Sequence, residues 1–189
     1  MNILEIGCGA GGILKYFKEK GFYVEGIDLG QEYIEYGKSK GLNLHCGDIN
    51  LQYKPDIIIY NHVLEHITDI NQHLEYLYNF IDKNTYIFIS VPGIKKAMLR
   101  NDFDFLLFLQ NAHIYYFSLA TLKNLMEKNN FKLIKGNEAI MSLFKPKDKN
   151  NKFILKNDYE NIMKNLKISE FVYNHKNLKK VLFKLRILN

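Results

Sequence analysis

The sequence predicts an α/β fold, in which a doubly wound and mostly parallel sheet carries helices on both faces. Short apolar runs alternate along the chain with segments of helical periodicity. A glycine-rich loop directly follows the first apolar run, and this arrangement is typical of the turn from a strand into a helix. Hydrophobic residues make up 47% and charged residues 24% of the 189 residues, and this balance excludes a disordered chain.

Seven segments have the character of strands. Residues 2–6 (NILEI) and 56–60 (DIIIY) are nearly continuous apolar runs, which is typical of strands buried on both faces. Residues 86–91 (YIFISV) form a similar run that stops at Pro92-Gly93. The remaining strands are expected at residues 23–27, 42–46, 131–135 and 139–144.

Helices are expected between these strands, at residues 13–20, 31–40, 71–81 and 119–129. Gly21 and Gly41 suit the ends of the first two, and Ser118 is a good N-cap for the fourth. Residues 94–117 are predicted to be a longer connection, which contains the apolar stretch FDFLLFL and His113. The inward faces are formed by Leu14 and Phe17, by Leu74, Leu77, Tyr78 and Ile81, and by Leu122, Leu125 and Met126.

The charge divides the chain at residue 144. Residues 145–189 contain 12 Lys and Arg against 4 Asp and Glu, whereas residues 1–144 have a net charge of −2. Residues 145–152 (KPKDKNNK) are predicted to be a linker, and residues 169–188 an amphipathic helix whose stripe is Leu178, Val181, Leu182, Leu185 and Leu188. We therefore expect a domain at 1–144 and a basic helical tail at 145–189. A tail docked on the body is favoured over one that contacts a membrane surface or nucleic acid.

The chain is expected to be soluble and cytoplasmic. No apolar run reaches the ~18–20 residues of a membrane span, and the first residues lack the pattern of a signal peptide. Cys8 and Cys46 form no CxxC pair, so a disulfide framework and a zinc knuckle are both excluded.

The glycine loop and three carboxylates predict the ligand. Gly7, Gly9 and Gly12 match the GxGxxG pattern of dinucleotide sites, but Glu5 at the exit of the strand would repel a pyrophosphate and attract a cationic amino group. Asp28 ends the second strand, where a carboxylate accepts the hydroxyls of a ribose, and Asp48 follows the third, where it can accept from an adenine amino group. S-adenosylmethionine suits this set, whereas NAD suits it poorly.

Several ordered motifs resemble those of class I S-adenosylmethionine-dependent methyltransferases, in particular the bacterial group that acts on small molecules and glycans. They are LEIGCGAGGIL, EGIDL, GDI, DIIIYNHVLEHI and HIYYFSLATLKNLMEKNNFKLI, and they span roughly residues 1–144. The resemblance implies a Rossmann-like sheet of seven strands with the last antiparallel. It also implies S-adenosyl-L-methionine as cofactor and a set of binding residues: Glu5, Gly7, Cys8, Gly9 and Gly11 around the methionine part, Asp28 on the ribose, Leu29, Asp48 and Ile49 at the adenine, and Asn61 beside the methionine end.

The chain departs from that pattern at its start. Relatives carry helices ahead of the first strand that help to cover the cofactor, whereas Met1 abuts the strand here. Two interpretations follow. Either the sequence is a piece of a longer protein, or the C-terminal helix takes over the role of covering the cofactor.

The histidines are the candidate catalytic groups. His62, His66 and His113, with Glu65, are expected near the transferred methyl group, where an imidazole can act as base toward a hydroxyl. The string His62-Val-Leu-Glu65-His66 matches the HxxEH protease motif, but it follows a strand instead of lying within a long helix, which disfavours a protease. Tyr115 and Tyr116 are candidates for the acceptor pocket, and His45, His73 and His175 are expected at the surface.

A metal at these histidines is the alternative to a metal-free site. The segment resembles that of ubiquinone-pathway and small-RNA 3′-end methyltransferases, in which two acidic residues and two histidines bind a divalent ion. Glu65, His66 and His113 occupy matching positions, but His62 replaces the first carboxylate, which suits zinc or iron better than magnesium. The sequence favours the site without metal.

The leading function is methyl transfer to an oxygen, or secondarily a nitrogen, of a small molecule or glycan precursor. A cofactor-binding subunit that depends on a protein partner is one alternative, and an RNA methyltransferase that uses the basic tail is another. The slightly acidic body disfavours nucleic acid, and a homo-oligomer stays open.

Overall fold

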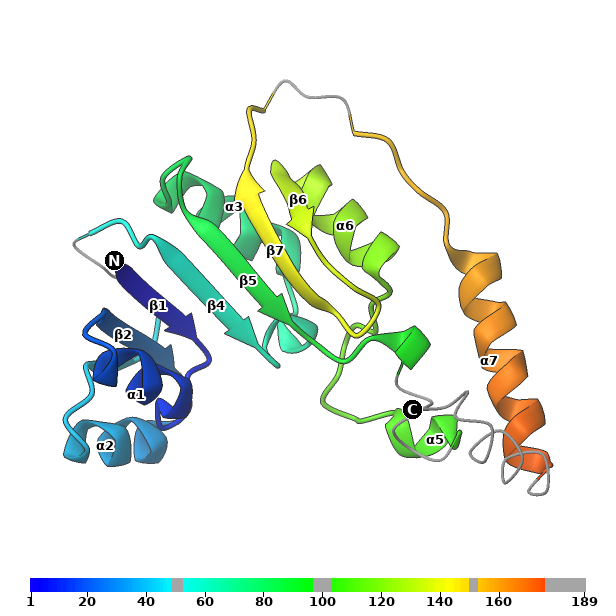
Figure 1. Cartoon of the computed structure of the whole chain (residues 1–189), viewed down its shortest axis with the longest axis horizontal. Coiled ribbons are helices and arrows are strands. Elements are labelled where there is room, and N and C mark those ends of the chain that lie inside the picture. The colour runs from blue at the N-terminus through cyan, green and yellow to red at the C-terminus, as the bar shows by residue number, and fades with distance from the viewer. Residues whose placement is uncertain (49–52, 97–102, 150–152, 176–189) are drawn as a thin grey trace.

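The computed structural model describes residues 1–48, 53–96, 103–149 and 153–175 (Figure 1). Its centre is a sheet of seven strands in the order β3-β2-β1-β4-β5-β7-β6. The strands are β1 (Asn2–Ile6), β2 (Tyr23–Asp28), β3 (Leu44–Cys46), β4 (Ile57–Asn61), β5 (Tyr86–Ser90), β6 (Phe131–Lys135) and β7 (Met141–Pro146). Strands β1 to β5 pair in parallel, and β7 is antiparallel to both of its neighbours. The predicted sheet, including its antiparallel last strand, is confirmed.

Helices cover the sheet from both sides. The helices α1 (Gly12–Glu19) and α2 (Gln31–Ser39) pack Leu14 and Ile34 on one face, against Ile3 and Ile59 of β1 and β4. On the other face lie α3 (Ile70–Phe80) and α6 (Leu119–Lys128), whose Leu74, Leu77, Leu122 and Met126 are buried. The inward faces expected from helical periodicity are therefore confirmed, because each apolar stripe meets one face of the apolar sheet.

Some boundaries differ from the sequence expectations. A short helix, α5 (Phe105–Phe108), and a 3-10 turn, η1 (Leu64–His66), lie in stretches that were expected to be irregular. Strand β7 extends to Pro146, so the first two residues of the predicted linker belong to the sheet. It pairs with both β5 and β6, and this ladder sets its end.

The C-terminal helix starts ten residues earlier than predicted. Helix α7 runs over Tyr159–Asn174, and residues 176–188 of the predicted 169–188 helix lie outside the described residues. The expectation was drawn from the leucine stripe, whereas α7 buries Ser169 and Val172 instead. Figure 1 shows α7 standing beyond α6 and beside α5, away from the central strands. The division of the chain at residue 144 stays a prediction.

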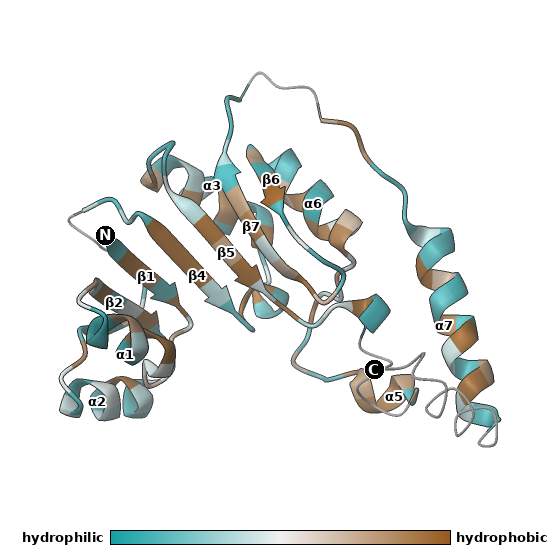
Figure 2. Ribbon diagram, viewed as in Figure 1, coloured by the Kyte–Doolittle hydropathy of each residue, from teal (hydrophilic) through white to brown (hydrophobic). Residues whose placement is uncertain are grey.

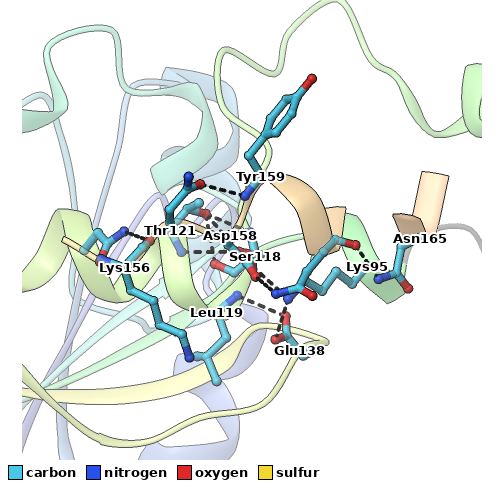
Figure 3. Close-up of polar contacts among 12 residues, drawn as sticks. Lys95, Ser118, Leu119, Thr121, Glu138, Lys156, Asp158, Tyr159 and Asn165 are labelled. Atoms are coloured by element: carbon cyan, nitrogen blue, oxygen red, sulfur yellow. Dashed lines mark hydrogen bonds and ion pairs between the residues drawn. The ribbon is translucent and has the colours of Figure 1, made fainter. Parts of the chain in front are cut away.

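A buried polar cluster attaches the start of α7 to the body (Figure 3). The Asp158 carboxylate, 4% exposed, accepts a hydrogen bond of 2.5 Å from the Ser118 hydroxyl at the N-terminus of α6. It also lies 2.8 Å from the Lys95 ammonium, which in turn is 3.2 Å from Glu138. Burial alone would raise the pKa of Asp158, but the hydrogen bonds from Lys95 and Ser118 lower it below its ordinary value. The cluster joins α7 to the segment after β5 and to the turn before β7.

Among the described residues, no helix is both long and apolar enough to cross a membrane.

Candidate active site

The loop between β1 and α1 depends on glycine at two positions for different reasons. Gly7 has φ +70°, and a Cβ atom there would lie 2.2 Å from Cγ2 of Val63, the residue after His62. Gly9 has φ +52° with open space beside it, so only its backbone conformation requires glycine. The close approach of Gly7 to Val63 places the glycine loop directly beside the segment that leaves β4.

Asp28, at the end of β2, braces this loop. Its Oδ2 atom accepts a hydrogen bond of 2.7 Å from the Gly9 N–H, and its Oδ1 atom accepts one of 2.8 Å from the Gly30 N–H. A carboxylate oxygen has a second lone pair, so both oxygens can still accept from a ligand hydroxyl. Asp28 therefore fixes the loop and lines the cavity described below.

Glu5 is a buried carboxyl group next to the loop. Its side chain is 3% exposed, and its Oε2 atom has no hydrogen-bond partner among the described residues. Burial, and secondly the charge of Asp28, raise the pKa of Glu5 from 4.5 to about 8. An unpaired buried carboxylate is costly, so this site favours a cation or a proton as its partner.

Cys8 is also buried. Burial, followed by the negative charges of Glu5 and Asp28, raises the pKa of its thiol to about 12. A thiol with so high a pKa is a poor nucleophile, so Cys8 has a packing role in the loop.

A cavity of about 850 Å³ lies at the carboxyl ends of β1 and β2. Of the predicted cofactor residues, Gly7, Asp28, Leu29 and Asp48 line it. The Leu29 side chain is 82% exposed, which leaves an apolar surface available to a flat ring. The predicted Ile49 lies outside the described residues, and the half-buried Asn61 ends β4 next to His62.

The opposite wall of the cavity comes mainly from α3, for which the sequence predicts only inward-facing core residues. It includes Ile67, ahead of α3, and the residues Asp69, Gln72, His73 and Tyr76, whose spacing puts them on one face of α3. The expectation of a surface position is wrong for His73, because its Nε2 atom lies 2.7 Å from the Tyr60 hydroxyl and burial lowers its pKa. The polar residues of 69–76, spaced i, i+3, i+4, i+7, are the sequence pattern that indicates this second, cavity-lining face of α3.

The predicted histidines come together around Glu65. The Glu65 side chain is 1% exposed, and neither carboxylate oxygen has a hydrogen-bond partner among the described residues. Its Oε1 atom lies 3.5 Å from His62 Nδ1 and 4.0 Å from His113 Nε2. His66 packs its ring against that of His113, with 4.8 Å between centroids.

The backbone holds this cluster in place. The carbonyl of Glu65 accepts hydrogen bonds from the N–H groups of Ile114 and Tyr115, at 2.9 and 3.2 Å, which ties η1 to the segment after α5. His66 Nδ1 lies 2.8 Å from the carbonyl of Ala112 in the same segment. His62 has φ +57°, a strained conformation for a residue with a Cβ atom and one that is common at functional sites.

The members of the cluster differ in their access to solvent. The His62 side chain is 52% exposed, whereas that of His113 is 4% exposed and its Nδ1 atom has no partner among the described residues. Burial, only partly opposed by Glu65, lowers the pKa of His113. Tyr116 packs against the His113 ring at 5.4 Å, and Tyr115 stacks on Phe117 at 5.8 Å. His62 and His66 are therefore the groups that a solute can reach, with Glu65 and the His113 side chain behind them.

Glu65, His66 and His113 also have the geometry of a metal site. Their candidate ligand atoms all lie within 4.8 Å of one another. One carboxylate and two imidazoles suit a first-row transition metal better than magnesium. The HxxEH string itself leaves β4 and forms the 3-10 turn η1, so it lacks the long helix of a protease site.

Comparisons with known proteins agree with this architecture. A family model described as a methyltransferase domain matches residues 1–135. The ubiquinone biosynthesis O-methyltransferase of Rickettsia canadensis is 28% identical over 166 residues, which cover 70% of this chain and 70% of that protein.

Solved structures share the fold at low identity. An S-adenosylmethionine-dependent methyltransferase from Clostridium acetobutylicum is 13% identical with a TM-score of 0.60, covering 78% of this chain and 84% of that one. A protein from Pyrococcus horikoshii is 16% identical with a TM-score of 0.61, covering 77% and 82%. At these identities the structures support the fold alone.

Proposed function

This chain belongs to the methyltransferase-domain family and is an S-adenosylmethionine-dependent methyltransferase, and from that premise we propose that it methylates an oxygen atom of a small molecule. One observation carries the proposal: a buried carboxylate without a hydrogen bond among the described residues, that of Glu65, lies behind the exposed imidazole of His62. His62 follows β4 directly, and its neighbour Val63 contacts the glycine loop. The candidate base therefore lies beside the cofactor loop.

The residues of the cavity suit the cofactor. Asp28 matches the ribose hydroxyls, and the exposed Leu29 matches an adenine face. Glu5 does not line the cavity but lies two residues before Gly7, which does, and its Oε2 atom, which has no hydrogen-bond partner among the described residues, matches a cationic amino group. When bound, S-adenosylmethionine supplies a methyl group activated on a sulfonium sulfur. The remaining predicted contacts, from Gly7, Cys8, Gly9, Gly11, Asp48, Ile49 and Asn61, are part of this proposal.

The histidine cluster removes the proton of the acceptor. A hydroxyl is a weak nucleophile, and it becomes stronger as His62 accepts its proton during attack. Glu65 stabilises the resulting imidazolium through the 3.5 Å contact to Nδ1, and His113 holds Glu65 from the buried side. His66 fixes the segment that carries His113, through its contact with Ala112. Alignment of the oxygen with the methyl group supplies the rest of the acceleration.

An oxygen acceptor is favoured because such a base helps a hydroxyl more than an amine that is already unprotonated. The R. canadensis relative bears the name of an O-methyltransferase, which supports the same choice at 28% identity. Phenols and sugar precursors are the two acceptor classes that we infer.

A divalent metal is a second candidate role for the same cluster. It is favoured by the clustering of Glu65, His66 and His113 ligand atoms within 4.8 Å and by the lack of hydrogen bonds to Glu65 among the described residues. These residues would bind a transition metal, which would lower the pKa of an acceptor hydroxyl. Metal content by elemental analysis, with activity before and after a chelator, distinguishes the two roles.

The test begins with the cofactor. Calorimetric titration with S-adenosylhomocysteine should show binding that Asp28→Ala weakens by at least roughly 100-fold, because two loop N–H contacts and the ribose acceptor are lost together. NADH in a parallel titration should not bind. Binding of NADH alone would refute the assignment of this site.

The second step tests the base. With nucleotide sugars and simple phenols as acceptors, His62→Ala should lower kcat by roughly 10²–10⁴-fold and leave S-adenosylhomocysteine affinity unchanged. His175→Ala, an exposed histidine at the end of α7, is the matched control and should retain full activity. Equal activity of the His62 variant and the control would contradict the proposed mechanism.

A further inference from the structure

Tyr60 and His73 form a hydrogen-bonded pair between the core and the cavity. Tyr60 belongs to β4, a strand that is hydrophobic along most of its length (Figure 2), and its side chain is fully buried. Its hydroxyl oxygen lies 2.7 Å from Nε2 of His73, and the two rings meet edge to face with 5.6 Å between centroids. His73 lines the cavity from α3. The imidazole therefore lies between a buried phenol and the space that a ligand would fill.

The burial of Tyr60 determines which atom of the pair donates the hydrogen bond. A buried hydroxyl proton needs an acceptor, because a buried donor without a partner is costly. Among the described residues, the hydroxyl of Tyr60 has its hydrogen-bond contact with His73. Burial also raises the pKa of Tyr60, so the phenol keeps its proton. The hydroxyl therefore donates, and Nε2 of His73 accepts.

This contact determines where the imidazole carries its hydrogen. Burial lowers the pKa of His73 below its ordinary value of 6.5, so the ring is neutral at pH 7. A neutral imidazole carries one N–H, and because Nε2 is the acceptor, the hydrogen lies on Nδ1. Within the described residues, the side chain of His73 makes its hydrogen bond through Nε2. The Nδ1–H group is therefore available to a ligand in the cavity.

The residues that share the cavity indicate which ligand this donor meets. Leu29 and Asp48, which are expected at the adenine, line the same cavity as His73. The candidate base His62 is not among the described residues that line it. His73 therefore faces the cofactor instead of the methyl acceptor.

We propose that His73 donates its Nδ1–H to a ring nitrogen of the adenine of the cofactor. The ribose and the amino group are matched in the proposed site by Asp28 and Glu5, whereas the ring nitrogens of adenine are acceptors that still need a donor. Tyr60 is the positioning residue of this contact. Without its hydroxyl, the hydrogen could move to Nε2, and Nδ1 would then present a lone pair to the lone pair of adenine. The contact with adenine rests on the proposed function, whereas the position of the hydrogen in the free protein does not.

The first measurement is heteronuclear NMR of the histidine ring nitrogens in the free protein at pH 7. His73 should show a protonated Nδ1 and an unprotonated Nε2, and Tyr60→Phe should shift hydrogen toward Nε2. A wild-type ring that carries its hydrogen on Nε2 would overturn the inference.

The second measurement is calorimetric titration with S-adenosylhomocysteine and its 1-deaza, 3-deaza and 7-deaza adenine analogues, each of which replaces one ring nitrogen by carbon. For the wild type, one analogue should bind roughly 3–10-fold more weakly than the parent compound, because one neutral hydrogen bond is lost. His73→Gln keeps an acceptor for Tyr60 but has no donor at the Nδ1 position. It should bind that analogue and the parent compound equally.

Two further variants complete the comparison. His73→Asn places an amide N–H near the position of Nδ1 and should retain the preference for the parent compound. His175→Gln, at an exposed histidine that follows α7, is the matched control and should behave as the wild type. Binding of S-adenosylhomocysteine by each variant shows that it is folded.

The outcomes separate this contact from the proposed function. If the wild type binds S-adenosylhomocysteine but responds to all three analogues as His73→Gln does, the contact is refuted and the cofactor assignment stands. If the wild type binds none of these compounds, the cofactor assignment fails, and the contact with adenine fails with it.

Discussion

Cofactor binding should release a proton from Glu5. In the free protein its carboxyl has a pKa of about 8, because the group is buried and lies near Asp28. About nine-tenths of the molecules therefore carry a proton on Glu5 at pH 7. If the cationic amino group of the cofactor binds there, the ionised form is favoured, and up to ~0.9 proton leaves on binding at pH 7.

The size of the effect follows from the same pKa. Ligand affinity should rise by about tenfold for each pH unit below the pKa and level off above it, which gives roughly a 50-fold rise from pH 6 to pH 8. The stability of the free protein changes in the opposite direction, and falls as the pH rises. Because the pKa of Glu5 is raised from 4.5, its contribution to stability is complete below pH 4.5 and is lost as the pH rises through 8. The loss by pH 7 is about 3 kcal/mol.

The assay is calorimetric titration with S-adenosylhomocysteine in two buffers of different ionisation enthalpy, since the difference in heat gives the number of protons released. On binding the ligand at pH 7, the Glu5→Gln variant should release about 0.9 fewer protons than the wild type. Without ligand, the variant should be more stable than the wild type at pH 9. The amino group of the ligand contributes equally to both proteins, so their difference isolates Glu5. Equal proton release by the two proteins would refute our account of Glu5.

Two further predictions concern the stability of the fold. Gly7→Ala should lower the free energy of unfolding by roughly 2–3 kcal/mol, because its Cβ would meet Val63 at 2.2 Å in a left-handed conformation. Gly12→Ala, with open space and a helical position, should instead stabilise by up to ~1 kcal/mol, and urea titration that ranked the two variants equally would contradict the loop argument. Asp158→Ala should cost roughly 2–4 kcal/mol at pH 7 by leaving Lys95 and Ser118 without their buried partner. Because the pKa of Asp158 is lowered, this difference should shrink as the pH falls below the ordinary carboxyl value of 3.8, and a constant difference in thermal melts across that range would count against it.

Much of the fold was predictable because its signals are local. The run DIIIY and the alternation of strands with amphipathic helices follow from periodicities of a few residues. Gly7 and Gly9 indicate a turn between strand and helix, and both have a positive φ in the structure. Helix α7 was placed less well, because the leucines after residue 175 gave a stronger periodic signal than the helix that the structure describes.

The candidate site was predictable in its members but not in its arrangement. The sequence determined the chemistry available, namely the acidic residues at the strand ends and the histidines after β4. Only the tertiary structure decided that Glu65 would be buried without a hydrogen bond and that His113, 48 positions later, would face it at 4.0 Å. It also decided that the polar side of α3 would form the far wall of the cavity, and that α5 would lie against α7. The physical reason is that burial and contacts between distant segments depend on how the sheet orders its strands, which no local pattern encodes.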